Sequence, residues 1–495
     1  MKKDWHIFAI WAAVSALLVF GLLAMEQSGC DTRTSRSAGS GDGASVDSDD
    51  DSADGIGAGG RKKDRDRKSQ DDPGSEDGGS SDDSARANGL PTVESIAAAV
   101  SALRGLPLNA AIEVSYIDRE ELQERIEEDF AEEYPPGELE AQGQALAALD
   151  LIPPGTDLRE ELEELMVDQI AGFYDDETKE LALVSDSDEL DVMNEVTLAH
   201  EVTHALQDQS FSLAGLYPVE GPGMADVNMA RLALVEGDAS LAMTEYVEAE
   251  LSLMDMFNLG MSGGGSLLGT SPYLDDSLLF PYLAGEEFVA QVKEKGGWEL
   301  VNAVYASPPE STEQIIHPEK YFEKDHPVFL ALPDLLPVAG AGWEAVYDDS
   351  FGEFDVRQLL AEGLRYRQAS EAAAGWDGGR YSYYERSDGA PMAVILLAWD
   401  SNEEAAEFTQ AMAEYLAYSY CSEFEFAERQ FPILESCDGD YWVMVKKGAA
   451  VLVARVPDRT LANLLPPAVL GVRPPEPGFA DNIQPGNVLA AHQGG

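Results

Sequence analysis

The sequence is poor in cysteine, histidine and basic residues. Its 495 residues include three cysteines, six histidines and 32 lysines or arginines, against 92 aspartates or glutamates. The resulting formal charge of −60 opposes the attraction to phosphate on which nucleic-acid binding depends. We therefore expect no nucleic-acid partner, whereas a cationic peptide would be attracted. The length exceeds that of one ordinary domain, and the apolar fraction of 44% is enough for a large core.

Long apolar runs are also scarce, and the most prominent one follows the N-terminus. Lys2 and Lys3 precede the apolar residues 7–25, IFAIWAAVSALLVFGLLAM. A basic start before such a run predicts an export signal, and the run is also long enough for a retained membrane-spanning helix. The small residues before Cys30, in QSGC, resemble a bacterial lipoprotein cleavage site. We expect an exported, periplasmic or cell-surface protein that residues 1–30 attach to a membrane, through a lipid on Cys30 or through the helix.

The two remaining cysteines, Cys421 and Cys437, lie near the C-terminus. An exported protein meets oxidising conditions, so the two thiols are candidates for one disulfide. Two separate buried thiols are the alternative.

Composition divides the rest of the chain. Residues 31–90 are rich in Asp, Ser and Gly and have few apolar residues, which predicts a disordered acidic tether. Residues 91–374 have mainly helical patterns, with two short strands around 172–174 and 180–184 joined by the polar turn DDETK. Residues 375–470 predict the order ββαβββα, and 471–495 form a tail. The expected class is α+β: a mainly helical domain with a small sheet, followed by a smaller α+β domain.

The stretch VTLAHEVTHALQDQ carries the clearest chemical signal. It places His200, Glu201 and His204 in the order H-E-x-x-H on a predicted helix. At 3.6 residues per turn the two histidines lie about 40° apart on one face, so both imidazoles can bind one metal ion. Glu201 lies beside that face, where it can act as a general base. The pattern predicts a zinc site.

A catalytic zinc site needs a third protein ligand. The metzincin pattern, in which a third histidine follows the motif closely, is absent. Glu236, in the apolar helical context RLALVEGDASLAM, is the best candidate, with Asp238 and Glu245 as alternatives. Gly237 is expected to permit close approach to the H-E-x-x-H helix, and Asp238 could accept a hydrogen bond from a histidine ligand.

These motifs resemble those of gluzincins, the thermolysin-like zinc metallopeptidases in which a glutamate on the next helix completes H-E-x-x-H. Three further segments narrow the resemblance to a poorly characterised group of exported bacterial gluzincin-like proteins. These segments are AGFYDDETKELALV, ALVEGDA and PPESTEQIIHPEKY, and the resemblance covers residues 151–322. The sequence departs from thermolysin at one point. Asp238 follows the ligand Glu236 by two positions, whereas the corresponding acidic residue of thermolysin follows by four.

The resemblance implies a zincin-like fold and hydrolysis of a peptide or protein substrate. Zn²⁺ would be held by His200, His204 and Glu236, with Glu201 as general base. The strand at 181–184 would be the sheet edge along which the substrate pairs. His317 would stabilise the oxyanion, with Tyr321 as second candidate.

One alternative keeps the metal without the catalysis. The chain would then be a zinc-containing envelope lipoprotein that acts as a binding or scaffolding module. Glu201 favours the peptidase, since a purely structural zinc site has no need of a general base.

Overall fold

The structure, a computed structural model, describes residues 91–185, 190–219, 221–262, 271–420, 433–436 and 439–471. The predicted anchor at 1–30, the tether at 31–90, the tail beyond 471 and the cysteines Cys30, Cys421 and Cys437 lie outside these ranges. Among the helices that these ranges contain, none combines the length and the apolar character needed to cross a bilayer.

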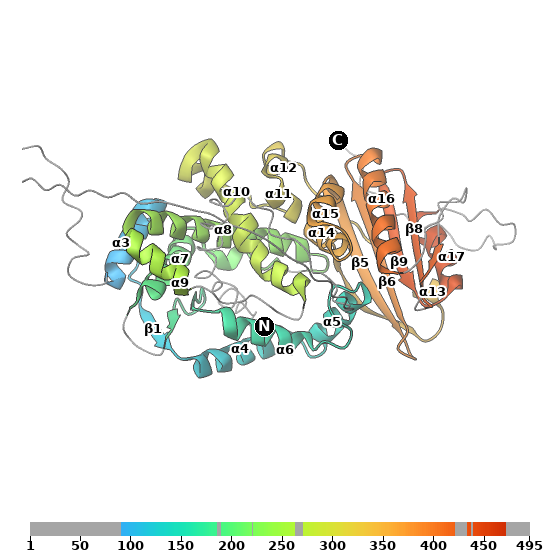
Figure 1. Cartoon of the computed structure of the whole chain (residues 1–495), viewed down its shortest axis with the longest axis horizontal. Coiled ribbons are helices and arrows are strands. Elements are labelled where there is room, and N and C mark those ends of the chain that lie inside the picture. The colour runs from blue at the N-terminus through green and yellow to red at the C-terminus, as the bar shows by residue number, and fades with distance from the viewer. Residues whose placement is uncertain are drawn as a thin grey trace, which may run out of the picture. The chain divides into compact units, whose positions relative to one another are not determined.

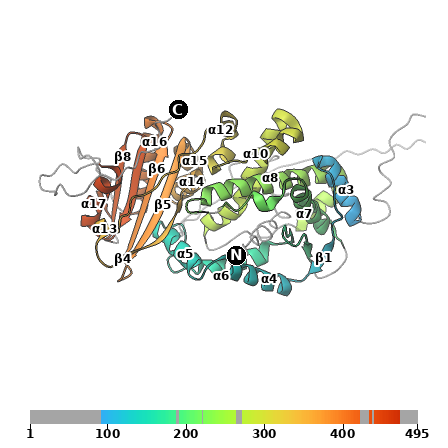
Figure 2. The same ribbon diagram turned by 180° about the vertical axis from the view of Figure 1, so that it is seen from behind.

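The protein is α+β, as predicted, with a helical part and two sheets (Figures 1 and 2). The elements before the large sheet are α3 (Val93–Arg104), β1 (Val114–Ile117), α4 (Arg119–Glu133), α5 (Glu138–Ala148), α6 (Leu158–Gln169), β2 (Gly172–Tyr174), β3 (Leu181–Val184), α7 (Val192–Phe211), the 3-10 helix η2 (Leu213–Gly215), α8 (Ala225–Glu250), α9 (Leu253–Ser262), α10 (Pro272–Val304), α11 (Thr312–Ile316), α12 (Pro318–Glu323) and α13 (Leu336–Ala339). The large sheet and its helices are β4 (Trp343–Ser350), α14 (Glu353–Ala361), α15 (Tyr366–Ala373), β5 (Trp376–Arg386), β6 (Pro391–Trp399), α16 (Asn402–Ser419), β7 (Ile433–Glu435), β8 (Tyr441–Lys447), β9 (Ala450–Val456) and α17 (Arg459–Leu470).

The small sheet has the strand order β1-β3-β2. The predicted hairpin of β2 and β3 is confirmed, and the Asp175 carboxylate accepts hydrogen bonds from the backbone N–H groups of Glu177 and Thr178 in its turn. However, β1 pairs in parallel with β3 after the chain crosses over through α4–α6. The strand at 181–184 is therefore central, and the expectation that it forms a sheet edge is wrong. The edges are β1 and β2.

The H-E-x-x-H sequence lies in α7, a helix with a complete start signal. The Asp191 side chain accepts a hydrogen bond from the backbone N–H of Asn194, and the Asn194 side chain accepts one from the backbone N–H of Asp191. This reciprocal capping satisfies two backbone donors that a helix N-terminus otherwise leaves open. Most of α7 is buried, because it packs against the small sheet on one side and against α8 on another.

Gly237 marks the closest approach in the helical part, but to α10 rather than to α7. A Cβ atom added to Gly237 would lie 2.0 Å from the carbonyl carbon of Gly285 in α10, and one added to Gly285 would lie 2.0 Å from the carbonyl oxygen of Ala233. The expectation that this glycine serves the contact with α7 is wrong. Since Gly237 follows Glu236 directly, the crossing of α8 and α10 fixes the position of the predicted third ligand.

We expect the G237A variant to destabilise the protein by about 3 kcal/mol, because backbone meets backbone and neither helix can yield locally. The gain in helix propensity from alanine, roughly 1 kcal/mol, is too small to offset this. Chemical denaturation measures the effect. G215A is the control, since a Cβ at Gly215 meets nothing within 4 Å; equal stability of both variants would contradict the close crossing.

The large sheet is antiparallel, with the order β4-β5-β6-β9-β8-β7. The predicted order ββαβββα is confirmed for β5 to α17. The sheet begins earlier than predicted, however, at Trp343 in β4 rather than after residue 374. This strand was missed because it carries three acidic residues and is only partly buried, as suits an edge strand.

Both faces of the large sheet are covered. Alternate side chains of β6 enter two different apolar clusters, because successive residues of a strand point to opposite faces. Ala393 and Ile395 join residues of α14, α15 and α16, while Val394 and Leu396 join residues of α13 and α17. The first cluster also contains Leu122 and many other side chains of α4–α6. The helical part and the sheet therefore share a core.

Candidate metal centre

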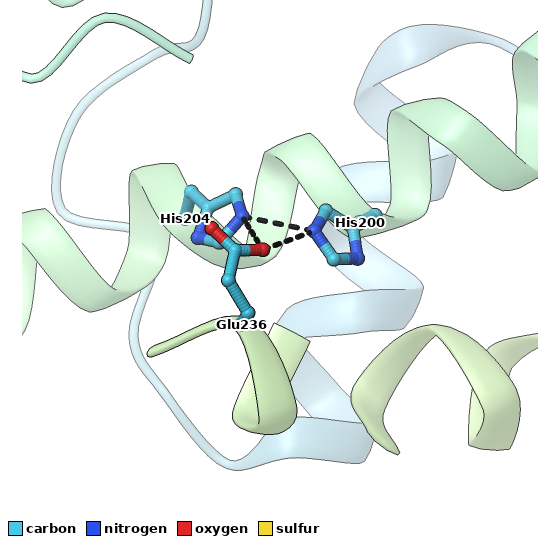
Figure 3. Close-up of side chains that lie close together, drawn as sticks. All are labelled: His200, His204 and Glu236. Atoms are coloured by element: carbon cyan, nitrogen blue, oxygen red, sulfur yellow. Dashed lines mark hydrogen bonds and ion pairs between the residues drawn. The ribbon is translucent and has the colours of Figure 1, made fainter. Parts of the chain in front are cut away.

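His200, His204 and Glu236 converge between α7 and α8 (Figure 3). The Nε2 atoms of the two histidines are 2.9 Å apart, and Glu236 Oε2 lies 3.2 Å from His200 Nε2 and 3.4 Å from His204 Nε2. All three side chains are buried. Two residues on one helix face and one on the neighbouring helix thus direct three ligand atoms at one point, as the sequence predicts.

The spacing of these atoms fits a tetrahedral metal site. Zinc holds nitrogen and oxygen ligands at about 2.0–2.2 Å, which places any two ligand atoms of a tetrahedron roughly 3.3–3.6 Å apart. The observed separations are at most a few tenths of an ångström shorter. Glu236 Oε1 is buried without a hydrogen-bond partner, although an unpaired buried carboxylate oxygen is costly. Two imidazoles and a carboxylate are a donor set that suits zinc.

Gln207 orients one of the histidines. Its Oε1 atom lies 2.9 Å from His204 Nδ1, and its amide nitrogen donates to the carbonyl oxygen of Val235 in α8. A hydrogen bond from Nδ1–H to this oxygen leaves Nε2 of His204 with the lone pair that a metal requires. Sequence reasoning missed this role; the only available signal was the spacing of three residues on the helix.

Glu201 has no side-chain hydrogen-bond partner in the described structure, although its side chain is fully buried. Both carboxylate oxygens are without one. Burial raises the pKa of this carboxyl well above its usual range, and His204 opposes the shift. The main chain of Tyr174 in β2 is close enough to lower the pKa slightly. Glu201 thus lies beside the ligand cluster and next to an edge strand, and no other side chain of the described residues hydrogen-bonds to its carboxylate.

Without a metal ion, a proton on His204 balances the Glu236 carboxylate. Burial lowers the pKa of His200 to about 4, so this imidazole is neutral. Burial acts in the same direction on His204, but the Glu236 carboxylate outweighs it and raises the pKa to about 9. Burial also works against ionised Glu236, yet the two imidazoles lower its pKa. A metal ion would replace the proton on His204 as the partner of the carboxylate.

The alternative third ligands, Asp238 and Glu245, lie in other contacts. Asp238 Oδ2 accepts hydrogen bonds from Arg104 Nη2 at 2.8 Å and from the Tyr305 hydroxyl at 2.6 Å. The expectation that Asp238 accepts a hydrogen bond from a histidine ligand is therefore wrong. Asp238 follows Glu236 by two residues, so its side chain lies on another side of α8 and points towards α3 and the end of α10. Glu245 pairs with Lys293 of α10. Glu236 is the carboxylate that the structure brings to the histidines.

His317 and Tyr321 take part in contacts that hold the chain before the large sheet. His317 Nε2 lies 2.9 Å from Glu353 Oε1 in α14, and its Nδ1 lies 4.0 Å from Glu319. The Tyr321 hydroxyl donates to the carbonyl oxygen of Ser307. These contacts join α11 and α12 to the large sheet's helices and give no support to an oxyanion-stabilising role, which stays a prediction.

We expect the H317Q variant to lower stability more near pH 6 than near pH 9. Pairing with Glu353 raises the pKa of His317 above its usual value, so the ion pair stabilises the fold below about pH 6.5 and is lost as pH rises through the folded-state pKa. Melting temperatures at the two pH values measure this. H326Q, at an exposed histidine paired with Glu310, is the control; an identical, pH-independent loss in both variants would contradict the pairing.

Asp208 ties the edge strand β2 to α7. Its Oδ2 atom accepts hydrogen bonds from the Tyr174 hydroxyl at 2.9 Å and from Lys179 Nζ at 2.6 Å. Asp208 lies two turns after Glu201 on nearly the same face of α7. The β2–β3 hairpin is therefore fastened to α7 on the side where Glu201 lies.

Comparison with known proteins gives little further information. Residues 342–465, the region of the large sheet, match a domain of unknown function, DUF8575. No curated protein and no solved structure matches the chain.

Proposed function

We propose that the protein is a zinc-dependent peptidase with a zincin-like helical part, in which His200, His204 and Glu236 hold the metal and Glu201 is the general base. The observation that carries the proposal is the buried Glu201 carboxylate, whose two oxygens lack side-chain hydrogen-bond partners beside three converging ligands. A site that only stabilised the fold would not need a second, unpaired carboxylate at this position.

Zinc, when bound, polarises a substrate carbonyl and makes water acidic enough to attack near neutral pH. Glu201 accepts the proton of the attacking water and delivers it to the amine that leaves as the peptide bond breaks. Burial raises the pKa of Glu201, and the positive charge of a bound metal ion would oppose this rise and favour the ionised form that accepts the proton. A base whose pKa lies near the operating pH can both accept a proton and return it. Gln207 keeps His204 in one tautomer throughout.

An extended substrate would pair with β2. This strand is an edge of the small sheet among the described residues, and its Tyr174 main chain lies beside Glu201. Addition of a strand to such an edge uses main-chain hydrogen bonds and tolerates many sequences. The substrate is then a peptide or an extended protein segment, which the exported and membrane-attached enzyme meets outside the cytoplasm.

One observation favours the alternative, a zinc-containing envelope protein without hydrolytic activity. His200, Glu201, His204 and Glu236 are all buried, with at most 1% of each exposed, as is common in structural metal sites. The two functions differ in a single assay. Incubation of the full chain with a peptide library should give cleavage products that disappear with a chelator and return with added zinc; the absence of products under all three conditions would favour the envelope protein.

A further inference from the structure

α9 presents large apolar side chains to solvent. Leu253, Met254 and Phe257 are 86%, 66% and 63% exposed. Leu253 and Met254 lie four and three residues before Phe257, so both are its neighbours on the helix surface. The three side chains form one patch, here called the α9 patch. Exposed apolar groups of this kind mark contact with a partner or a membrane.

The other side of α9 is fixed to the protein. Leu259 is buried and Met256 is partly buried in the apolar cluster that contains Leu198 and Val202 of α7. The α9 patch is therefore held outward by a helix that is anchored to the metal-binding helix, rather than being a detached segment.

The same cluster contains the start of the described chain. Ile96 and Val100 of α3 belong to it, and Figure 1 shows α3 and α9 at the same end of the described part. The 92 residues before α3 include the apolar run at 7–25, which predicts attachment to a membrane. The α9 patch thus lies on the part of the fold from which the chain continues towards its predicted anchor.

We propose that the α9 patch lies on the surface of a lipid bilayer, the membrane to which the N-terminus is attached. This inference rests on the proposed attachment and is independent of whether the site hydrolyses peptides. A single apolar anchor often needs a second, weaker membrane contact for a stable position. A tether also raises the effective concentration of the patch at the bilayer, so a few side chains suffice.

The size and charge of the surroundings favour lipid over a second copy of the chain. A large aromatic side chain buries only about 150–250 Å², so three residues fall short of the roughly 800 Å² per partner found in stable interfaces. The exposed Glu248 and Glu250 and the partly buried Asp255 lie beside the patch, and no basic residue occurs in 248–262. We therefore expect contact with zwitterionic lipid to be stronger than contact with anionic lipid.

Footprinting with hydroxyl radicals tests the proposal on the full chain in phosphatidylcholine nanodiscs that hold one chain each. Phe329 is the internal control, because its 62% exposure equals that of Phe257 within one per cent. Relative to Phe329, we expect the rates at which Phe257 and Met254 are modified to be at least about fivefold lower than the exposure of these side chains predicts. This protection should weaken when phosphatidylglycerol replaces phosphatidylcholine. The L253S/F257S variant, which changes only exposed side chains, should keep the fold and restore modification of Met254.

Three results would overturn the proposal. The first is equal modification of Phe257 and Phe329 in the bilayer. The second is protection that occurs only with two or more chains in a disc, which would assign the α9 patch to self-association. The third is a full chain that does not associate with bilayers at all. None of these results depends on peptidase activity, so the failure of one proposal is distinguishable from the failure of the other.

Discussion

The E201Q variant is expected to lose peptide hydrolysis while it keeps its metal. Glutamine retains the size of the side chain but cannot accept the proton of the attacking water, and general base catalysis of this kind contributes about 10²–10⁴-fold. The carboxylate of Glu201 is not among the three converging ligand atoms, so zinc content should stay at the wild-type level. Cleavage rates of a peptide found in the library assay, together with elemental analysis, measure both effects.

Glu195 provides a matched control on the same helix. It is also buried in α7, and its Oε1 atom accepts a hydrogen bond from the Tyr246 hydroxyl at 2.9 Å. The E195Q variant removes a buried carboxylate of α7 without touching the ligand cluster, so the cleavage rate of its folded fraction should stay within a few-fold of wild type. Wild-type rates in E201Q would refute the role of Glu201, and loss of zinc from E201Q would show that this carboxylate is a ligand.

The E236A variant is expected to bind zinc at least about 100-fold more weakly than wild type. Three ligands become two, and loss even of a residue that only supports a ligand can cost 10–100-fold in affinity. Competition with a chromophoric chelator measures the affinity and suppresses weak binding by the many surface carboxylates. E245A is the control, since Glu245 lies on the same helix and pairs with Lys293.

The E245A variant should bind zinc as wild type does. If E236A and E245A bound zinc equally well, Glu236 would not be a ligand. The same outcome would remove the reason for the orphaned Oε1 atom of Glu236, which the bound metal or the substrate is expected to satisfy.

Local patterns predicted the elements that carry the site. The spacing of His200 and His204 on one helix face needs only helix geometry. The turn chemistry of DDETK predicted the β2–β3 hairpin with both strands in place. Such features depend on neighbours in the sequence, so the sequence alone was sufficient.

Contacts between distant segments could not be predicted in this way. β3 is the central strand because it pairs with β1, and the helices α4–α6 separate the two strands in the sequence. No local pattern specifies a pairing of such distant segments. Gly237 was rightly recognised as a point of close approach, but the partner helix α10 lies far along the chain. Asp238 was expected to accept a hydrogen bond from a histidine because it follows the ligand Glu236 closely in the sequence. Its partners in the structure are instead Arg104, at the end of α3, and Tyr305, directly after α10.

The resemblance to gluzincins predicted which side chains converge, but not the contacts of the residues around them. It named Glu236, which the structure places with His200 and His204. It also suggested His317, whose observed partner is Glu353 of α14. A histidine before a proline in a short helical segment is equally suited to a joint between parts of the fold, and only the three-dimensional contacts separate the two roles.

X-ray absorption at the zinc edge of the full chain, loaded with less than one equivalent of zinc, tests the metal centre most directly. We expect zinc to have four nitrogen and oxygen ligands at about 2.0–2.1 Å, together with the outer-shell scattering of two imidazoles. Those imidazole features should vanish in the H200A/H204A variant. A shell of oxygen alone, unchanged in that variant, would show that zinc binds the acidic surface and would contradict the metal centre.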